Sequence, residues 1–103
     1  MLFLDEPTAS LDPRHQMDLL AAASSLARDE GVAVLVVLHD VNLAAAWCDR
    51  LLLLAGRRVV ALGTPTEVLT STHLHQVYAV DARVMPHPAT TGQPLVVFSR
   101  PAA

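Results

Sequence analysis

Two adjacent carboxylates, Asp5 and Glu6, are the residues whose types and position are best suited to chemistry. They follow the apolar residues 2–4, which predict a strand buried on both faces of a parallel sheet. Pro7 ends that strand, because proline cannot donate to the hydrogen-bond ladder. Ligands of open α/β sheets bind beyond the carboxyl ends of the strands, so the pair lies where such folds carry out chemistry.

The two carboxylates could divide the work of hydrolysing a phosphoanhydride. Side chains alternate along a strand, so we expect Asp5 and Glu6 to point in different directions. One could help to hold a hydrated Mg²⁺ while the other orients or deprotonates a water. The alternative is a buried strand whose two acids are only solvated at its exposed end, and the pair taken alone favours that alternative.

His39 follows a second predicted strand, the apolar run 32–38. A helix is predicted between the strands, from its N-cap Asp12 to the terminating Gly31. A strand–helix–strand crossover makes the two strands parallel, so His39 is expected at the same sheet edge as the carboxylates. A lone histidine is more often structural, and the combination of residues rather than His39 itself carries the prediction.

The rest of the chain predicts short elements. We expect a helix after His39, and then a hairpin of strands 50–54 and 59–62 on the edge of the sheet. A capping box starts a further helix, with Thr64 as N-cap and Glu67 at its third position. Thr72 is expected to cap a last helix. The segments 83–85 and 95–98 predict a C-terminal hairpin.

Composition excludes several classes of protein. At 103 residues and 52% hydrophobic, the chain fits one small domain or part of a larger one, and not a disordered segment. A net charge of −3 without any lysine predicts no basic surface for binding nucleic acid. The single cysteine, Cys48, allows no intrachain disulfide and favours a reducing compartment. The apolar run 32–38 is too short to span a bilayer, and the early acidic residues argue against a signal peptide.

The other histidines do not predict a metal site. His73 and His75 are two residues apart and face different directions on a helix, so they cannot form an i, i+4 ligand pair. His15 is expected at the surface of the long helix and His87 in a loop between two prolines. We therefore expect no zinc site.

Residues 2–12, Leu-Phe-Leu-Asp-Glu-Pro-Thr-Ala-Ser-Leu-Asp, closely resemble the Walker B strand and D-loop of ABC-type ATPases. The resemblance implies that Asp5 contacts Mg²⁺ through water and that Glu6 is the catalytic base. His39 matches the switch histidine, which contacts the γ-phosphate of ATP. The residues matching the D-loop, which touches the opposite subunit of an ATPase dimer, are Ser10, Leu11 and Asp12.

The resemblance also implies a fold. The expected class is α/β: a partial P-loop NTPase (ABC ATPase) with a RecA-like core of parallel strands and flanking helices, plus a small C-terminal hairpin. Residues 1–79 would be the C-terminal part of the nucleotide-binding domain, and residues 80–103 a tail that forms the hairpin.

Finer features resemble the importers of iron–siderophores, haem and cobalamin. These features are Arg14-His15-Gln16 after the D-loop and the run 39–45 at the switch. The tail 84–95 is most similar to the hemin branch. We therefore expect the energy-coupling ATPase of a hemin importer, with a siderophore or cobalamin importer as the alternative. The implied partners are a second ATPase subunit, two transmembrane permease subunits and, indirectly, a periplasmic or surface substrate-binding protein. The implied location is the cytoplasmic face of the bacterial inner membrane, to which the subunit would bind peripherally.

The sequence departs from the family in one large respect. It contains no lysine, no glycine-rich P-loop and no Leu-Ser-Gly-Gly-Gln-type signature. We therefore expect the C-terminal part of a longer ATPase, which by itself does not hydrolyse ATP. A non-catalytic remnant that only binds a partner subunit is an alternative of another class. A soluble ABC ATPase of DNA repair or translation is a third, against which the acidic balance argues.

Overall fold

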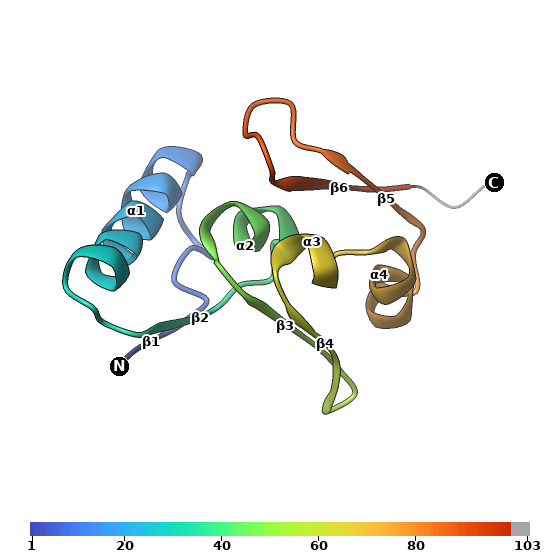
Figure 1. Ribbon diagram of the computed structural model, residues 1–103, viewed down its shortest axis with the longest axis horizontal. Helices are drawn as coiled ribbons and strands as arrows, with labels where there is room; N and C mark the ends of the chain where they lie inside the picture. Colours follow the sequence, from blue (N-terminus) through green and yellow to red (C-terminus); the bar gives the residue numbers. More distant parts are fainter. Residues whose placement is uncertain (100–103) are drawn as a thin grey trace. The chain divides into compact units, whose positions relative to one another are not determined.

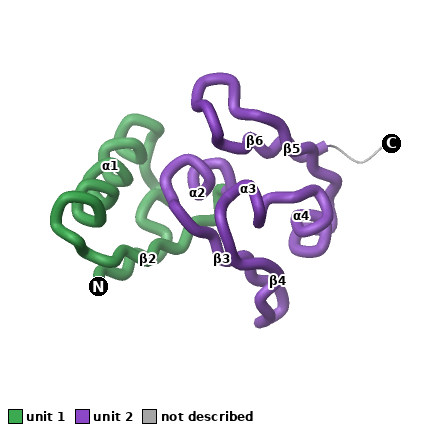
Figure 2. Tube along the Cα trace, in the orientation of Figure 1, with its two compact units in different colours: residues 1–40 green, residues 41–103 purple. Residues whose placement is uncertain are grey.

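The computed structural model describes residues 1–99; residues 100–103 lie outside the described part. The chain divides into two compact units, residues 1–40 and residues 41–103, coloured green and purple in Figure 2.

The first unit contains one strand–helix–strand crossover. Its elements are β1 (Leu2–Asp5), α1 (Pro13–Asp29) and β2 (Val34–Val37) (Figure 1). The strands pair in parallel, from Leu2 opposite Val34 to Asp5 opposite Val37. The predicted parallel crossover is therefore confirmed, although β2 is shorter than the apolar run that predicted it.

Both strands are covered on one face only, so the prediction of strands buried on both faces is wrong for this structure. Burial alternates along β1 and β2 between half-buried and exposed residues. Phe3 is 55% exposed and Leu35, its pairing partner, is 50% exposed. A continuous apolar run shows that both faces of a strand can be buried. They are buried only if another element packs on each face. Within this unit α1 contacts β2.

Helix α1 begins and ends as its sequence predicts. The Asp12 carboxylate accepts a hydrogen bond from the His15 backbone N–H at 2.9 Å, and Pro13 opens the helix. Gly31 has φ +65°, the left-handed conformation that commonly follows a helix.

The second unit contains two hairpins and three helices (Figure 1). Its elements are α2 (Val41–Trp47), β3 (Leu51–Ala55), β4 (Arg58–Gly63), α3 (Pro65–Val68), α4 (Ser71–Tyr78), β5 (Ala82–Pro86) and β6 (Pro94–Phe98). Strands β3 and β4 are antiparallel, as are β5 and β6, so the predicted C-terminal hairpin is confirmed.

The β3–β4 hairpin forms a two-stranded sheet of its own, so its predicted place on the edge of the parallel sheet is wrong. Gly56 and Arg57 both have positive φ, at +56° and +64°, as the tight turn of a two-residue hairpin requires. A register shift between Leu53 and Leu54 interrupts the ladder. Local sequence specifies such a turn, but it does not specify which sheet edge the hairpin joins.

The core of the second unit is built from residues of all its helices. Val68, Leu69 and Leu74 are its most deeply buried large side chains. The other members of this cluster are Val41, Ala45, Leu51 and Val96.

The side-chain amide of Asn42 joins α2 to β6. Its Nδ2 donates to the Val96 carbonyl oxygen at 3.0 Å, and its Oδ1 accepts from the Val96 N–H at 2.8 Å. Val96 is only 3% exposed, so one side chain satisfies both backbone groups of a buried strand residue.

The predicted capping box of α3 is confirmed. The Thr64 hydroxyl accepts from the Glu67 N–H at 3.3 Å, and the Glu67 carboxylate accepts from the Thr64 N–H at 3.0 Å. A Cβ added to Gly63 would lie 3.0 Å from Glu67 Oε1, so the first turn of α3 closes against a glycine.

The N-cap of α4 is Thr70, and the prediction of Thr72 is wrong. The Thr70 hydroxyl accepts from the His73 N–H at 3.2 Å. Either threonine is a good cap by residue type; the helix begins at Ser71, so only Thr70 is in the capping position.

None of the helices within residues 1–99 combines the length and the apolar character needed to cross a membrane.

Candidate functional site

Glu6 and His39 lie together at the carboxyl edge of the parallel strands. His39 Nε2 is 2.9 Å from Glu6 Oε1. The Glu6 side chain is 25% exposed, whereas that of His39 is 87% exposed. The distance is that of an ion pair, but the ring N–H is not aligned for a hydrogen bond, so Glu6 Oε1 is buried without a hydrogen-bond partner. The two residues, predicted from separate strand ends, therefore form one acid–imidazole pair.

The position of Glu6 comes from an unusual backbone conformation. Its N–H donates to the Val37 carbonyl at 3.0 Å, which continues the ladder one residue beyond β1. Its φ is +51°, in the left-handed region that residues with a Cβ rarely adopt. Glu6 therefore leaves the regular strand geometry on which the expectation of alternating directions for Asp5 and Glu6 was based.

Asp5 ends β1 with an exposed side chain and offers an oxygen donor to a divalent cation. Within residues 1–99, no three His, Cys, Asp or Glu side chains gather as a metal-binding group. In phosphate-transferring sites Mg²⁺ keeps several waters and is held by one or two carboxylates together with substrate phosphates. The donor set fits a hydrated Mg²⁺ that arrives with a nucleotide, and it does not fit an all-protein cage.

The loop of residues 7–12 connects this pair to α1. Its turns are closed by hydrogen bonds from the Ala9 N–H to the Glu6 carbonyl at 3.4 Å and from the Leu11 N–H to the Thr8 carbonyl at 3.1 Å. Thr8 is 4% exposed, whereas the three residues that match a D-loop, Ser10, Leu11 and Asp12, are all exposed. The loop is thus anchored by its first half and presents its second half to solvent.

The remaining histidines have local structural partners. His15 Nδ1 lies 2.8 Å from Asp12 Oδ1, and His73 Nδ1 lies 2.8 Å from the Val68 carbonyl oxygen. His87 Nδ1 accepts from the backbone N–H groups of Ala89 and Thr90, at 3.0 and 3.1 Å.

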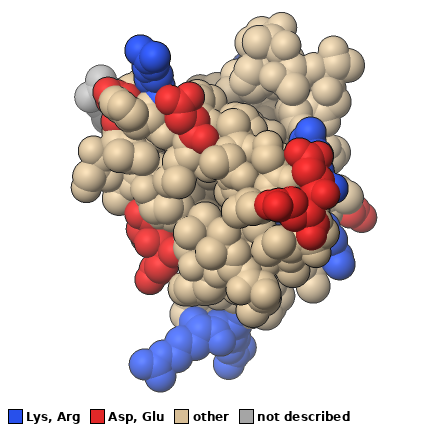
Figure 3. All heavy atoms as spheres, turned by 90° about the vertical axis from the view of Figure 1, so that its left-hand side faces the viewer, with Lys and Arg blue, Asp and Glu red and all other residues tan. Residues whose placement is uncertain are grey.

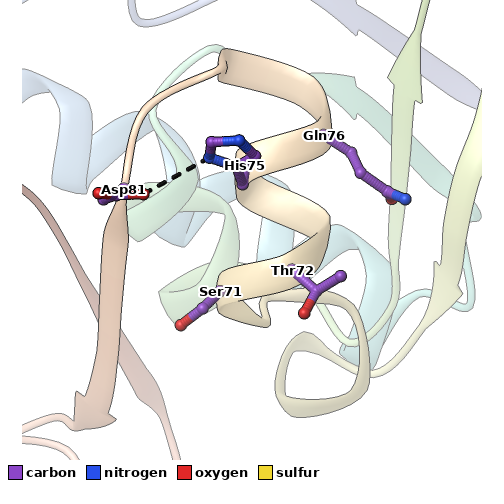
Figure 4. Close-up of a pocket in the computed structure, with 5 residues that line it drawn as sticks. All are labelled: Ser71, Thr72, His75, Gln76 and Asp81. Atoms are coloured by element: carbon purple, nitrogen blue, oxygen red, sulfur yellow. Dashed lines mark ion pairs between the residues drawn. The ribbon is translucent and has the colours of Figure 1, made fainter.

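A shallow depression lies beside α4 (Figure 4). It is lined by Ser71, Thr72, His75, Gln76 and Asp81. His75 Nδ1 and Asp81 Oδ1 are 3.5 Å apart, and their side chains are 63% and 88% exposed. A pair this exposed is a weak surface interaction, so it does not make the depression a catalytic centre.

Cys48 is not an activated thiol. Burial raises the pKa of its thiol, and the nearby Asp49 carboxylate raises this pKa further. A reactive cysteine needs the opposite shift, toward the thiolate.

Gln16 and Asn42 make hydrogen bonds that the sequence did not predict. Gln16 is a polar residue four positions after the N-cap Asp12, and Asn42 lies near the start of α2. Those positions are a usable signal in the sequence, but their partners, Thr8 and Val96, depend on tertiary structure.

Both the fold and the sequence match known transport proteins. The fold superimposes with a TM-score of 0.81 on a solved structure described as an inward-facing conformation of a metal-chelate type ABC transporter. The superposition covers 95% of this chain and 39% of the other chain, at 24% sequence identity. Over 97 residues, the chain is 60% identical to the hemin import ATP-binding protein HmuV of Bordetella avium. The chain is related to ABC-transporter ATP-binding proteins.

Other ABC relatives give the same result. The HmuV proteins of Bordetella pertussis and Pseudomonas entomophila are 54% and 53% identical over 96 residues. Each match covers at least 93% of this chain but only 37% of the relative, so the chain spans little more than a third of the length of these ABC proteins. No protein-family model matches the chain. The α/β class expected for part of an ABC ATPase is confirmed by the fold match.

Charged side chains are scattered over the face shown in Figure 3, between large uncharged areas. No continuous basic surface is visible on that face. The net charge of −3 is consistent with this distribution.

Proposed function

We propose that this chain supplies the catalytic-base and switch-histidine part of the ATP-hydrolysing, energy-coupling subunit of an ABC importer whose cargo is hemin. The observation that carries the proposal is the contact of Glu6 Oε1 with His39 Nε2, 2.9 Å apart at the carboxyl edge of two parallel strands. The names of the relatives, which are hemin import ATP-binding proteins, support both ATP binding and hemin as the cargo.

In this mechanism Glu6 accepts the proton of the water that attacks the γ-phosphoryl group. Its Oε1 is buried beside His39 Nε2, 2.9 Å away, so in this proposal a water reaches the carboxylate once His39 turns away from it. His39 is exposed and its Nε2 adjoins Glu6, so it can turn from the carboxylate to orient the water and the γ-phosphate. Asp5 would hold Mg²⁺ through water, and the cation would neutralise the phosphate charges.

The remaining assignments extend the same proposal. Ser10, Leu11 and Asp12 would contact a second ATPase subunit, and residues 1–79 would belong to the nucleotide-binding domain, with residues 80–103 as its tail. Two membrane permease subunits, and indirectly a substrate-binding protein, would complete an importer at the cytoplasmic face of the inner membrane. The triphosphate cradle has to come from outside this sequence, which contains no lysine and no P-loop.

A hybrid protein tests the function. The matching segment of Bordetella avium HmuV is replaced by this chain, and the steady-state ATPase rate and ATP binding are measured. Glu6→Gln keeps the size of the side chain but removes the base, so we expect a loss of about 10²- to 10⁴-fold in rate with ATP still bound. His39→Ala should also suppress turnover.

The matched controls are His73→Ala and His75→Ala, which should leave turnover close to that of the parent hybrid. An inactive parent hybrid, a Glu6→Gln variant with near-normal turnover, or control histidines as important as His39 would overturn the proposal. Restored uptake of hemin by cells that lack their own HmuV would show that the hybrid works with a hemin permease.

A second candidate is a non-catalytic interaction module. The observation that favours it is the absence of a P-loop and of lysine from the sequence. The purified chain with Mg-ATP should turn over no faster than its Glu6→Gln variant. Clear hydrolysis that depends on Glu6 in the chain alone would exclude this candidate.

A further inference from the structure

Two neighbouring side chains in the first turns of α1 reach back to the loop of residues 7–12. Gln16 Nε2 donates to the Thr8 carbonyl oxygen at 3.3 Å. His15 Nδ1 lies 2.8 Å from Asp12 Oδ1. The pair therefore contacts both ends of the loop that begins directly after Glu6.

The Gln16 contact is the more sheltered of the two. Thr8 is 4% exposed and Gln16 is half-buried. His15 and Asp12 have side chains 64% and 60% exposed, and an ion pair so exposed contributes little. A hydrogen bond away from water is stronger, and its loss leaves a carbonyl without one of its donors.

The Thr8 carbonyl oxygen accepts two hydrogen bonds, one from α1 and one from within the loop. It accepts from Gln16 Nε2 and also from the Leu11 N–H, at 3.1 Å. Gln16 donates from a helix whose own backbone is fixed at this point, since its N–H donates to the Asp12 carbonyl at 2.9 Å. The rigid start of α1 thereby fixes where Thr8 lies.

Glu6 needs such a constraint, because the left-handed conformation is unfavourable for a residue with a Cβ. On its strand side Glu6 is held by its N–H bond to Val37, at 3.0 Å. On its loop side its carbonyl accepts from the Ala9 N–H, at a long 3.4 Å. Strained residues persist only where the surrounding structure over-determines them, and the loop side is the weaker of the two supports.

We propose that Gln16 is a positioning residue for Glu6: by holding the Thr8 carbonyl, it keeps Glu6 in the left-handed conformation that places Glu6 Oε1 beside His39 Nε2. The inference rests on the proposed role of Glu6 as catalytic base. In this role Gln16 acts on Glu6 through the Thr8 carbonyl and the loop.

The test uses the same hybrid protein, with two substitutions at position 16. Gln16→Met keeps the length of the side chain and removes its donor. Gln16→Lys keeps a donor of similar reach. We expect Gln16→Met to lower kcat about tenfold with the KM for ATP within about twofold, since only the proton-accepting step depends on Glu6. Gln16→Lys should stay within about threefold of the parent in both constants.

Gln76→Met is the matched control, because it makes the same exchange at an exposed position of another helix. It should leave kcat and KM unchanged. The thermal midpoint of every variant is measured beside the kinetics. If Gln16→Met does not fold, the kcat of Gln16→Lys alone tests the proposal. A low kcat in a folded Gln16→Lys variant would overturn it.

The two proposals fail in different ways. A parent hybrid that is active and inactivated by Glu6→Gln, but in which Gln16→Met retains full kcat, would overturn the role of Gln16 and leave the proposed function standing. Equal losses in Gln16→Met and Gln16→Lys, or a raised KM, would show that residue 16 acts through packing and not through its donor. An inactive parent would refute both proposals.

Discussion

The amide of Asn42 offers a sharp test of how the second unit is held together. In Asn42→Leu, the N–H and the carbonyl of Val96, a residue 3% exposed in this structure, lose partners at 2.8 and 3.0 Å. An unpaired buried backbone group costs roughly 1–3 kcal/mol, so losing both costs about 2–4 kcal/mol if the strand opens slightly to water. Because each 1.4 kcal/mol is a factor of ten, local opening of β6 should rise about 30- to 700-fold.

Hydrogen exchange measured by mass spectrometry on the segment 94–98 reports that opening directly. Exchange at β3, in the same unit, is the internal reference and should accelerate much less. Asn42→Asp keeps an acceptor for the Val96 N–H but loses the donor to its carbonyl, so its effect should be intermediate. Gln76→Leu, at an exposed position, is the neutral control. Less than threefold acceleration in Asn42→Leu, or equal acceleration at β3, would refute this account of the α2–β6 contact.

Three further predictions concern packing and titration. Leu74 has a fully buried side chain, 0% exposed, so Leu74→Ala should lower the free energy of unfolding in urea by about 3 kcal/mol. Leu62 is 61% exposed, so Leu62→Ala should lower it by less than about 0.5 kcal/mol. Equal losses in the two variants would contradict the assignment of Leu74 to the core. Alkylation of Cys48 should be slower than that of the denatured chain near pH 8.5, because burial raises the pKa of the thiol; equal rates would contradict it. Hydrogen bonds from Thr64 lower the pKa of Glu67 below its ordinary 4.5, so its stabilisation is present above that pH and is lost on acidification below it. The difference in thermal midpoint between the parent and Glu67→Gln should therefore shrink from pH 6 to pH 3, and a constant difference would count against the capping box.

Sequence patterns predicted the elements that are specified locally. Asp12, Gly31 and the Thr64–Glu67 pair act through contacts within four residues, and the structure contains each of them in its expected role. The approach of Glu6 and His39 was also predictable, because parallel strands bring their carboxyl ends to one edge.

The features that sequence patterns missed depend on distant parts of the chain. The exposure of Phe3 depends on whether any element packs on that face of the sheet, which an apolar run cannot reveal. The left-handed conformation of Glu6 was not expected, because glycine is the residue that predicts positive φ from sequence. Thr70 and Thr72 are equally good caps by type, and the start of α4 decides between them. The Asn42–Val96 contact spans more than fifty positions, beyond the reach of any local pattern.

The close approach of Gly63 to Glu67 links the substitutions that these two positions can accept. An alanine Cβ at position 63 would lie 3.0 Å from Glu67 Oε1, the atom that accepts the hydrogen bond from the Thr64 N–H, which is closer than most Cβ contacts. Gly63→Ala alone would require the Glu67 carboxylate to shift by a few tenths of an ångström, whereas a smaller residue at position 67 would relieve the contact. Replacement of the glycine should therefore be easier after replacement of the glutamate, so this contact influences the order in which the two changes are accepted.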